Sequence, residues 1–428
     1  MHMPGAAADG AIVNPAGLAE LAWQRLQPET WPLPPEAFPA EATLVGGAVR
    51  DALLDRLGPQ PDLDLVVTGD AVGLCKTLSR RHGGTAVVLD AERSIARLVI
   101  SGWSIDLARL EGGSLEADLH RRDYTINAIA LPLTKPNQLV DPLQGCRDLA
   151  TGLLVAISEA NLLDDPLRLL RGLRLSAELG FQLAAETRQW IAQHHSALAS
   201  VAGERVLTEL EKLAAAPNGH QQLGEGLELG LLSPWLARSQ PVDQVVLSRC
   251  TAQASLALGL SASEASWALP LARLAAALDG AALQKLRSSR KLQQRVIALR
   301  HWQQLLGSLD PGGTAQALPE PERLQLHRDL EADLPALLIN WGDSTAKAWL
   351  LRWHDPEDRL FHPRPAIDGA TLQRELEIKA SPELGALLLH LMQEQAFGRL
   401  NSPSDALQFA RNWLASTEEA GGRARRRD

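Results

Sequence analysis

Two short runs indicate the fold and chemistry of this chain: Gly46-Gly47-Ala48-Val49-Arg50-Asp51 and, shortly after it, Asp62-Leu63-Asp64. The glycine pair predicts a tight turn that opens a helix, and backbone N–H groups at such a turn can approach phosphate oxygens closely. Side chains alternate along a strand, so Asp62 and Asp64 are expected on one face. Neighbouring carboxylates repel each other unless a cation lies between them, and Mg²⁺ commonly binds carboxylates together with substrate phosphates. The two runs therefore predict a nucleoside triphosphate held beside a metal-binding strand.

Each half of this pattern also has a plainer interpretation. A Gly-Gly pair before a helix is often only a turn, and Asp-x-Asp is often a solvated strand end. Here strand-like runs flank the glycine turn at Thr43–Val45 and Leu63–Val67. The order of strand, glycine turn, helix and acidic strand favours the functional interpretation.

Composition limits the classes of protein to which the chain can belong. With 428 residues, 45% of them hydrophobic, roughly two to four domains are expected. No apolar run reaches membrane-spanning length, and residues 1–10 lack the features of a secretory signal. Cys75, Cys146 and Cys250 are isolated, which favours a reducing compartment, the cytoplasm, without a disulfide framework. The formal charge of −9 means that any nucleic-acid binding depends on local basic patches.

Hydrophobic patterning divides the N-terminal half into two regions. Residues 1–40, rich in Ala and Pro, are expected to form a loosely attached extension. Residues 41–150 alternate strand-like and helical runs, which predicts an α/β domain with a small mixed sheet. The predicted strands are Thr43–Val45, Leu63–Val67, Thr85–Leu89, Ala96–Ile100, Ser104–Leu107 and Thr125–Leu131, and the predicted helices are Val72–His82 and the segment after Gly47.

Beyond about residue 158 the apolar residues recur at three- and four-residue spacing, which predicts helices. Breaks fall at 216–219, 309–313 and 362–365. Most tryptophans lie in this half, where helix packing is a commoner role for them than base stacking. The predicted fold class is α+β, with a mixed-sheet domain followed by helical domains.

A second cluster is Arg121-Arg122-Asp123-Tyr124-Thr125-Ile126-Asn127-Ala128, in which two arginines lead into a strand-like run. Arginine presents a planar fork of donors that suits phosphate. The alternative is an ordinary solvated start of a strand.

A third cluster, Asp164–Arg174, predicts a helix N-terminus with Asp165 as N-cap before a proline. Arg168, Arg171 and Arg174 recur every three residues, so neighbouring arginines stay close on one ridge. Like charges so arranged need anions, which phosphates or the Asp165 carboxylate would supply.

Asp165 and Arg168 also form a possible base-reading pair. A carboxylate accepts from an amino group and a guanidinium donates to ring nitrogen or oxygen, which matches cytosine or adenine. Uracil and guanine present a carbonyl where Asp165 needs a donor, and unpaired buried groups can discriminate by about 10⁴-fold. Further on, Arg205 and Glu209 are spaced i, i+4, as in an ordinary exposed ion pair.

In this order, the clusters resemble the class II tRNA nucleotidyltransferase and bacterial poly(A) polymerase family, within the wider DNA polymerase β-like nucleotidyltransferases. Gly46–Gly69 matches the family signature closely, and Arg121–Ala130 matches apart from Tyr124 in place of Phe. Further likenesses, in chain order, are Asp141–Gly145, Asp164–Phe181 (with Asp164 for Glu and Leu175 for an aromatic residue), Glu204–Leu213 and parts of Ile367–Trp413.

The resemblance implies a polymerase β-like nucleotidyltransferase head at 41–150. An all-helical neck at 151–215, a body at 216–360 and a tRNA-binding tail at 361–428 would follow. It implies template-independent addition of nucleotides from CTP, and in some members ATP, to the tRNA 3′ end. The chemistry is an in-line displacement assisted by two Mg²⁺ ions, with pyrophosphate leaving. Neither an obligate protein partner nor a membrane is indicated.

The resemblance also implies a role for each matched residue. Asp62 and Asp64 would hold the metal, and Asp106 on a neighbouring strand would assist them. Phosphates and sugar would be held by Gly46, Gly47, Arg50, Arg122, Arg171 and Arg174, and the base by Asp165 and Arg168.

One departure from the family bears on the nucleotides added. Many members carry a longer flexible loop between the Asp106-x-x-Arg109 segment and Arg121, needed to switch the pocket from C to A. Here only Leu110–Ser114 separates that strand from the next helix-like stretch. The short loop favours the subgroup that adds only the two cytidines. Complete CCA addition, A addition and poly(A) synthesis remain as alternatives.

Other classes of function are less well supported by the sequence. A non-catalytic RNA-binding scaffold would not need the carboxylate pair, and a small-molecule nucleotidyltransferase would not need the long helical half. His354-Asp355 resembles a phosphohydrolase motif of some relatives but lacks partner histidines, which favours a loop. The basic run Arg423–Arg427 could touch phosphate, but is expected to be a disordered end.

Overall fold

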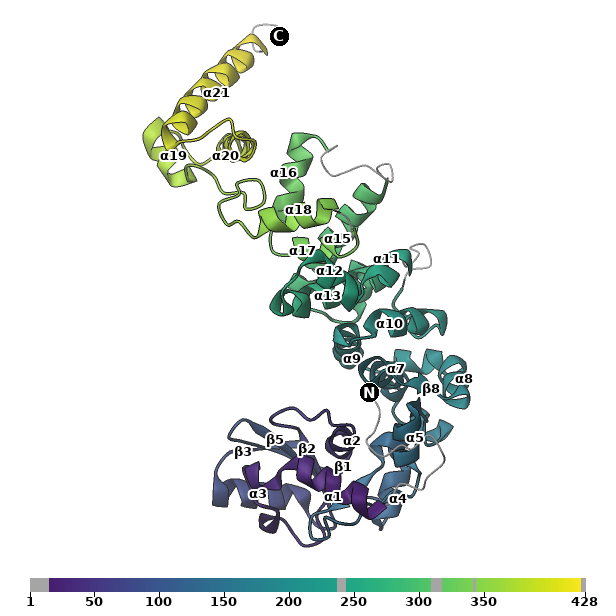
Figure 1. Ribbon diagram of the computed structural model, residues 1–428. Coiled ribbons are helices and arrows are strands. Elements are labelled where there is room, and N and C mark those ends of the chain that lie inside the picture. Colours follow the sequence, from purple (N-terminus) through teal and green to yellow (C-terminus); the bar gives the residue numbers. More distant parts are fainter. Residues whose placement is uncertain (1–14, 237–243, 309–317, 342–343, 425–428) are drawn as a thin grey trace. The chain divides into compact units, whose positions relative to one another are not determined.

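The computed structural model describes residues 15–236, 244–308, 318–341 and 344–424, with side chains to residue 416. The chain divides into two units: residues 1–209 with 225–234, and residues 210–224 with 235–428. The first unit contains the strands, drawn in purple to teal in Figure 1, and the described part of the second is helical. The predicted α+β fold class is confirmed.

A six-stranded mixed sheet forms the centre of the head, in the order β3-β4-β5-β2-β1-β6. β2 and β5 pair in parallel, and the other neighbours pair antiparallel. The strands are β1 (Thr43–Val45), β2 (Leu63–Val67), β3 (Thr85–Asp90), β4 (Ile95–Ile100), β5 (Trp103–Arg109) and β6 (Ala130–Pro132). The central strands β1, β2 and β5 bury apolar residues, which fixes the register of the acidic positions on them.

The prediction of a strand over Thr125–Leu131 is wrong for its first half. Thr125–Asn127 forms a short 3₁₀ turn, because Asn127 N–H bonds to the Tyr124 carbonyl (3.0 Å) and Ala128 N–H to that of Thr125 (3.0 Å). Only β6 is extended. A buried turn and a buried strand share the same apolar composition, so periodicity does not distinguish them over such a short run.

Short helices cover the head sheet. α2 (Gly47–Leu53) follows β1 directly and buries Val49 and Leu53, and α3 (Ala71–His82) packs against β3, β4 and β5. α4 (Leu115–His120) begins at Ser114, whose side chain accepts from the Ala117 N–H at 3.1 Å. This cap fixes the end of the loop that follows β5.

The expectation of a loosely attached N-terminal extension is wrong for residues 15–40. Helix α1 (Pro15–Leu26) packs on α2, and Arg25 donates to the carbonyls of Ala52 (2.9 Å) and Leu53 (3.1 Å). The apolar residues of this segment are buried, among them Leu18, Ala22, Leu26, Trp31, Leu33 and Phe38. The segment is thus part of the head core, because these side chains bury a substantial apolar area.

The rest of the first unit is helical apart from a two-residue parallel pair, β7 (Leu153–Leu154) and β8 (Gln182–Leu183). Its helices are α5 (Gly145–Thr151), α6 (Glu159–Asp164), α7 (Leu167–Leu179), α8 (Ala185–Gln193) and α9 (Gly203–Ala215), which continues into the second unit. Asp165 was predicted as an N-cap; instead it closes α6 as C-cap in an extended conformation, and α7 begins at Leu167 after Pro166. Asp165 Oδ1 still accepts weakly from the Leu167 N–H, at 3.4 Å.

The remaining helices are α10 (Gly219–Glu228), α11 (Gln244–Arg249), α12 (Ala252–Leu258), α13 (Ala262–Ala277), α14 (Gly280–Lys285), α15 (Arg290–Ser308), α16 (Glu320–Asp329), α17 (Leu334–Leu338), α18 (Ser344–Trp353), α19 (Gly369–Leu376), α20 (Pro382–Ala396) and α21 (Pro403–Ala424). The predicted break at 216–219 falls between α9 and α10, whose first residue is Gly219, and the break at 362–365 lies between α18 and α19. The break at 309–313 is outside the described residues. Trp235, Trp302 and Trp349 are buried, as helix packing predicts. None of the described helices has the length and apolarity needed to cross a membrane.

The sequence also predicted a loop at His354-Asp355 and a disordered basic end at Arg423–Arg427. His354 lies in the turn after α18, where its Nε2 contacts Glu264 Oε1 at 2.6 Å, so the loop interpretation is confirmed. The side chains of Arg423–Arg427 are outside the described residues.

Candidate active site

The glycine turn places a strand end, a carboxylate and an arginine next to one another. Gly46 adopts φ 76° and ψ −139°, a conformation that side chains other than hydrogen rarely allow. A Cβ at this position would lie 3.1 Å from Asp64 Oδ2 and 3.6 Å from Arg122 Nη1. A Cβ at Gly47 would meet Arg50 Nη2 at 3.6 Å. The backbone at Gly46 therefore approaches Asp64 and Arg122 closely, at a distance that only glycine allows.

Three acidic residues converge around β2. Asp64 lies on β2 directly opposite Asp106 on the parallel strand β5, and the exposed Asp62 immediately precedes β2. Burial, together with the negative charges of Asp106 and Asp62, raises the pKa of Asp64 to about 6, although Arg122 and Arg97 act to lower it. A carboxyl group in this environment gains stability from a cation nearby, so the arrangement fits a divalent metal bound jointly with substrate phosphates.

Asp106 is held by an arginine that the sequence analysis did not identify. Arg97, its cross-strand neighbour on β4, donates from Nε to Oδ1 (2.7 Å) and from Nη2 to Oδ2 (2.8 Å). Among the described residues, no three His, Cys, Asp or Glu side chains are arranged to hold a metal ion. Asp62, Asp64 and Asp106 thus do not form a preformed cage, and the ligands beyond the protein carboxylates would come from phosphates and water.

Two arginines near the glycine turn differ in how many of their hydrogen-bond donors are already used. The Arg50 side chain is almost fully buried and donates to Asp51 (2.8 and 2.9 Å) and to Asn127 Oδ1 (2.7 Å). Arg122 donates from Nη2 to Asp118 Oδ2 at 3.2 Å, and its buried Nε has no hydrogen-bond partner among the described residues. Of the two, Arg122 retains more hydrogen-bonding capacity for a ligand.

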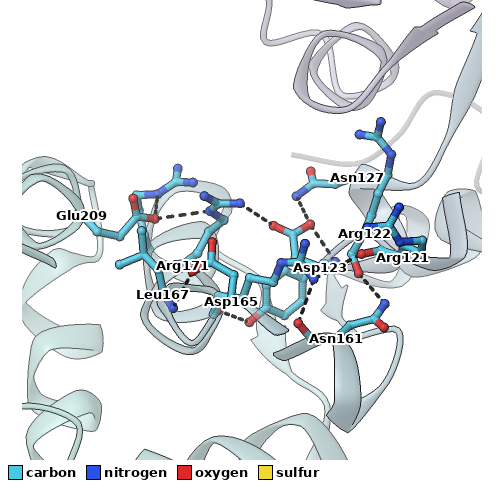
Figure 2. Close-up of polar contacts among 12 residues, drawn as sticks. Arg121, Arg122, Asp123, Asn127, Asn161, Asp165, Leu167, Arg171 and Glu209 are labelled. Atoms are coloured by element: carbon cyan, nitrogen blue, oxygen red, sulfur yellow. Dashed lines mark hydrogen bonds and ion pairs between the residues drawn. The ribbon is translucent and has the colours of Figure 1, made fainter. Parts of the chain in front are cut away.

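A network of ion pairs connects α7 and α9 to the 121–127 segment (Figure 2). Arg171 Nη1 donates to Asp123 Oδ2 (3.1 Å), and Asn127 Nδ2 donates to Asp123 Oδ1 (3.1 Å). Glu209 accepts from Arg174 Nε (2.6 Å) and lies 3.8 Å from Arg171 Nε. Burial alone would raise the pKa of Asp123, but Arg171 and the hydrogen bonds from Asn127 and the Tyr124 N–H outweigh it and lower that pKa. Asp123 is therefore an ionised anchor for Arg171.

The carboxylates that accompany the arginine ridge are not the one that was predicted. Of the two expected partners, the Asp165 carboxylate does not pair with the ridge: Asp123 and Glu209 do, and Glu178 accepts from Arg174 Nη1 at 2.6 Å. The binding of phosphates by the ridge stays a prediction. The predicted exposed pair of Arg205 with Glu209 is also wrong. Arg205 Nη2 pairs with Asp165 Oδ2 at 2.9 Å, and Glu209 is buried against the ridge, because the two side chains face different neighbours.

Arg168 connects the start of α7 to the double-arginine segment. Its Nη1 donates to the carbonyls of Asn161 (2.8 Å) and Arg121 (3.2 Å). Asn161 Nδ2 in turn donates to the carbonyls of His120 and Arg122, at 2.7 Å each. These bonds fix Arg168 beside the segment that carries Arg122, and Arg205 fixes the nearby Asp165.

The short loop after β5 is tied down at both ends. Leu110 N–H donates to the Val67 carbonyl (2.7 Å) and Glu111 N–H to Asp118 Oδ1 (3.2 Å), while the Glu111 side chain pairs with Arg121. Gly112 has φ 77°, and a Cβ there would lie 2.8 Å from Ala117 Cβ. The loop is therefore a compact connection held by hydrogen bonds and an ion pair.

Two protein-family models match the chain. Residues 42–155 match the Poly A polymerase head domain, and residues 180–237 match the probable RNA and SrmB-binding site of polymerase A. These matches cover the head with its glycine turn and part of the helical region that follows.

Whole-chain relatives extend the match. A CC-adding tRNA nucleotidyltransferase of Synechocystis sp. is 33% identical over 87% of this chain and 94% of its own length. The chain belongs to the tRNA nucleotidyltransferase family. A CC-adding member from Thermus thermophilus is 32% identical over 90% of this chain and 95% of its own, and an A-adding member from Deinococcus radiodurans is 30% identical over 90% and 98%.

The fold is that of solved members of the tRNA nucleotidyltransferase family. The Thermotoga maritima CCA-adding enzyme, determined in complex with tRNA, superposes with a TM-score of 0.67, covering 93% of this chain and 98% of that one. Its sequence identity of 20% supports the fold alone.

For this member of the family, sequence reasoning identified the glycine turn, the acidic strand and the arginines, but not their supporting partners. Asn127 and Asp123 lie within the quoted 121–128 cluster, and their polar side chains in a strand-like apolar run were the available signal. Arg97, Asn161 and Glu209 act across strands or between helices. Nothing in their local sequence indicates the partners they contact.

Proposed function

We propose that this chain adds cytidine nucleotides from CTP to the 3′ end of tRNA without a template, as a CC-adding enzyme. The observation that carries the proposal is the close approach of the Gly46 backbone to both Asp64 and Arg122. A carboxylate that gains stability from a cation and a guanidinium with an unused donor suit a triphosphate bound together with a metal.

In this proposal Asp62 and Asp64 hold Mg²⁺, with Asp106 assisting. Mg²⁺, when bound, supplies charge neutralisation to the triphosphate and activates the terminal 3′ hydroxyl. That hydroxyl loses its proton to solvent as its oxygen bonds to the α-phosphorus, the bond from the α-phosphorus to the oxygen that bridges to the β-phosphate breaks, and pyrophosphate leaves. Gly46 and Gly47 admit phosphate oxygens to the backbone, Arg50 shapes the turn, and Arg122 donates to a phosphate.

The neck arginines have complementary roles. Arg171 and Arg174 contact sugar or phosphate while Asp123 and Glu209 hold their guanidinium planes in fixed orientations. Asp165 accepts from the cytosine amino group and Arg168 donates to its ring acceptors. Arg205 donates to Asp165, and Arg168 donates to the carbonyls of Asn161 and Arg121. These contacts support the pair because they reduce the number of rotamers that the two side chains can adopt.

CC addition is preferred over complete CCA or A addition on two grounds. The loop at Leu110–Ser114 is short and held by Val67, Asp118 and Arg121, so it lacks the freedom expected of a loop that reshapes the pocket. Two of the relatives described above are CC-adding enzymes. A addition is the second candidate, because the Deinococcus relative is an A-adding enzyme of nearly equal identity.

A head at 41–150 carries out the reaction in this scheme, and a neck at 151–215 reads the base. A body at 216–360 and a tail at 361–428 hold the tRNA. Cys75, Cys146 and Cys250 are not joined in disulfides, which supports the cytoplasm as the compartment.

The test uses a tRNA transcript that lacks its 3′ CCA, incubated with Mg²⁺ and CTP, ATP or both, with products resolved at single-nucleotide length. We expect extension by two nucleotides with CTP, unchanged when ATP is added. Growth by a third nucleotide with ATP would identify a complete CCA enzyme, and extension only of a CC-ended transcript would identify an A-adding enzyme. Asp64→Asn should abolish extension, whereas Glu186→Gln, on the exposed side of α8, should not.

A further inference from the structure

The second unit contains a cavity that none of the roles above uses. Its volume is about 320 Å³, and it is lined by Arg323 and His327 of α16, Trp349 and Arg352 of α18, and Leu360 and Phe361. This volume is that of a small-molecule site and exceeds what one phosphate needs, leaving room for an attached sugar.

His327 is the most deeply buried polar residue of this cavity. Only 2% of it is exposed, and its Nδ1 finds no hydrogen-bond partner among the described residues. Its ring packs on Phe361 (centroids 4.0 Å apart) and Trp349 (4.9 Å). Burial lowers the pKa of His327 to about 3, so the ring is neutral. A buried polar atom without a partner costs free energy, and a ligand that bonds to it would remove that cost.

The two arginines of the cavity are not equivalent. Arg352 is neutralised by Asp358, to which it donates at 2.7 and 3.1 Å, and its guanidinium carbon lies 4.5 Å from the centre of the Phe361 ring. Arg323 forms no direct ion pair within the part of the chain that the structure describes, and its buried Nε has no partner there. Its guanidinium carbon lies 5.1 Å from the centre of the Phe397 ring, and its charge helps to lower the pKa of Glu320. Arg323 is therefore the arginine of the cavity that no carboxylate binds directly.

The aromatic rings do not offer a free face for a base. Phe361 is contacted by His327 and by Arg352, and Trp349 packs edge-on against Trp341 and Phe361. What the cavity offers is a guanidinium, an unpaired ring nitrogen and space, which suits an oxyanion better than a stacked base.

We propose that this cavity binds the phosphate group of a nucleotide, with Arg323 as the charged donor and His327 as a hydrogen-bonding partner. The phosphate could belong to the RNA backbone or to a free nucleotide, since the recognising chemistry is the same. The RNA source rests on the proposed function, whereas the phosphate site itself does not.

The first arm compares Arg323→Gln with Arg328→Gln, an exposed arginine of the same helix with the same change in charge. Affinity for tRNA is measured against salt concentration, together with the KM values for tRNA and CTP. If the site holds an RNA phosphate, Arg323→Gln should weaken tRNA binding roughly tenfold and reduce the salt slope by about one. Arg328→Gln should change neither, and the KM for CTP should stay constant in both variants.

In the second arm the full chain is titrated with inorganic phosphate and with CMP, and binding is measured by broadening of the ³¹P resonance of the ligand. Loss of this broadening in Arg323→Gln, with tRNA affinity unchanged, would support a free phosphate as the ligand. Arg323→Lys keeps the charge and should retain part of the effect in whichever arm responds, and thermal unfolding checks that each variant folds.

The proposal is overturned if Arg323→Gln changes neither tRNA affinity nor phosphate binding, or if Arg328→Gln has an equal effect in both arms. The ³¹P arm keeps this result separate from the fate of the proposed function, because phosphate binding is measured without nucleotidyl transfer. A wild-type protein that binds phosphate through Arg323 but extends no tRNA would contradict only the proposed function.

Discussion

Asp64 combines burial with two negatively charged neighbours, and this has a measurable effect on stability. Its folded-state pKa of about 6 exceeds the ordinary value of 3.8. The folded protein therefore binds more protons between these values, and its free energy of unfolding falls as pH rises through that window. We expect Asp64→Asn to be more stable than the wild type at pH 7 with chelator, on the order of 2 kcal/mol.

Urea unfolding from pH 4 to pH 7 measures this difference, which should shrink toward pH 4. Glu36→Gln, at an exposed position of the head, is the control and should follow the wild type. Added Mg²⁺ should stabilise the wild type more than Asp64→Asn at pH 7. Parallel pH profiles for Asp64→Asn and the wild type would contradict the electrostatic account of this residue.

Tyr124 has a hydroxyl group where the family signature has Phe, and the structure gives that group a specific contact. The side chain is fully buried, and its hydroxyl donates to the Arg168 carbonyl at 2.8 Å. The hydroxyl lies against Gly172, where an added Cβ would clash with it. Tyr124→Phe should cost about 1 kcal/mol and loosen the start of α7. We expect the ratio of kcat/KM for CTP over UTP to fall; a loss of stability with an unchanged ratio would limit Tyr124 to a structural role.

Among the elements, the N-terminal segment makes the largest unexpected contribution to the head. Trp31 is 6% exposed, and its Nε1 donates to the Leu26 carbonyl at 2.9 Å. Trp31→Ala should lower the free energy of unfolding of the head by about 3–5 kcal/mol, because it removes a large buried side chain. Trp23→Ala, at a half-buried position 6.2 Å away between ring centroids, should cost less in the same urea titration. Equal losses would show that Trp31 is not a core residue.

The sequence predicted most elements of the head but few of the contacts between them. Alternating apolar residues identified β2, β4 and β5, and the glycine pair identified the start of α2. Burial of α1 was missed because periodic apolar residues do not reveal which surface covers them. The Arg97–Asp106 pair depends on the register of β4 against β5, and Arg174–Glu209 joins residues 35 positions apart. Such pairings arise from tertiary structure, which a local pattern does not encode.

The division of the chain into two compact units predicts that a substitution that destabilises one unit need not unfold the other. Arg273 on α13 is fully buried in the second unit and donates to the carbonyls of Ala214, Ala216, Pro217 and Cys250 at 2.6–3.1 Å. Burial lowers its pKa to about 10, so it stays charged at pH 7. Arg273→Leu should leave these carbonyls without a donor and cost about 3–5 kcal/mol.

Hydrogen exchange read by mass spectrometry localises this effect. In Arg273→Leu, amide protection should fall in residues 210–224 and 262–277 while β1, β2 and β5 keep theirs. The exposed Arg290→Leu is the control and should change neither region. A loss of protection in the head strands of Arg273→Leu would mean that the two units unfold together.

The backbone conformation of Gly46 has a consequence for how the gene can vary. Any base change at the first or second position of a glycine codon introduces a side chain or a stop, and here the added atom would meet the Asp64 carboxylate. At Gly58 and Gly69, no heavy atom of the described residues lies within 4 Å of an added Cβ. In a library of all single codon changes under selection, position 46 should tolerate only synonymous codons, while alanine codons survive at 58 and 69.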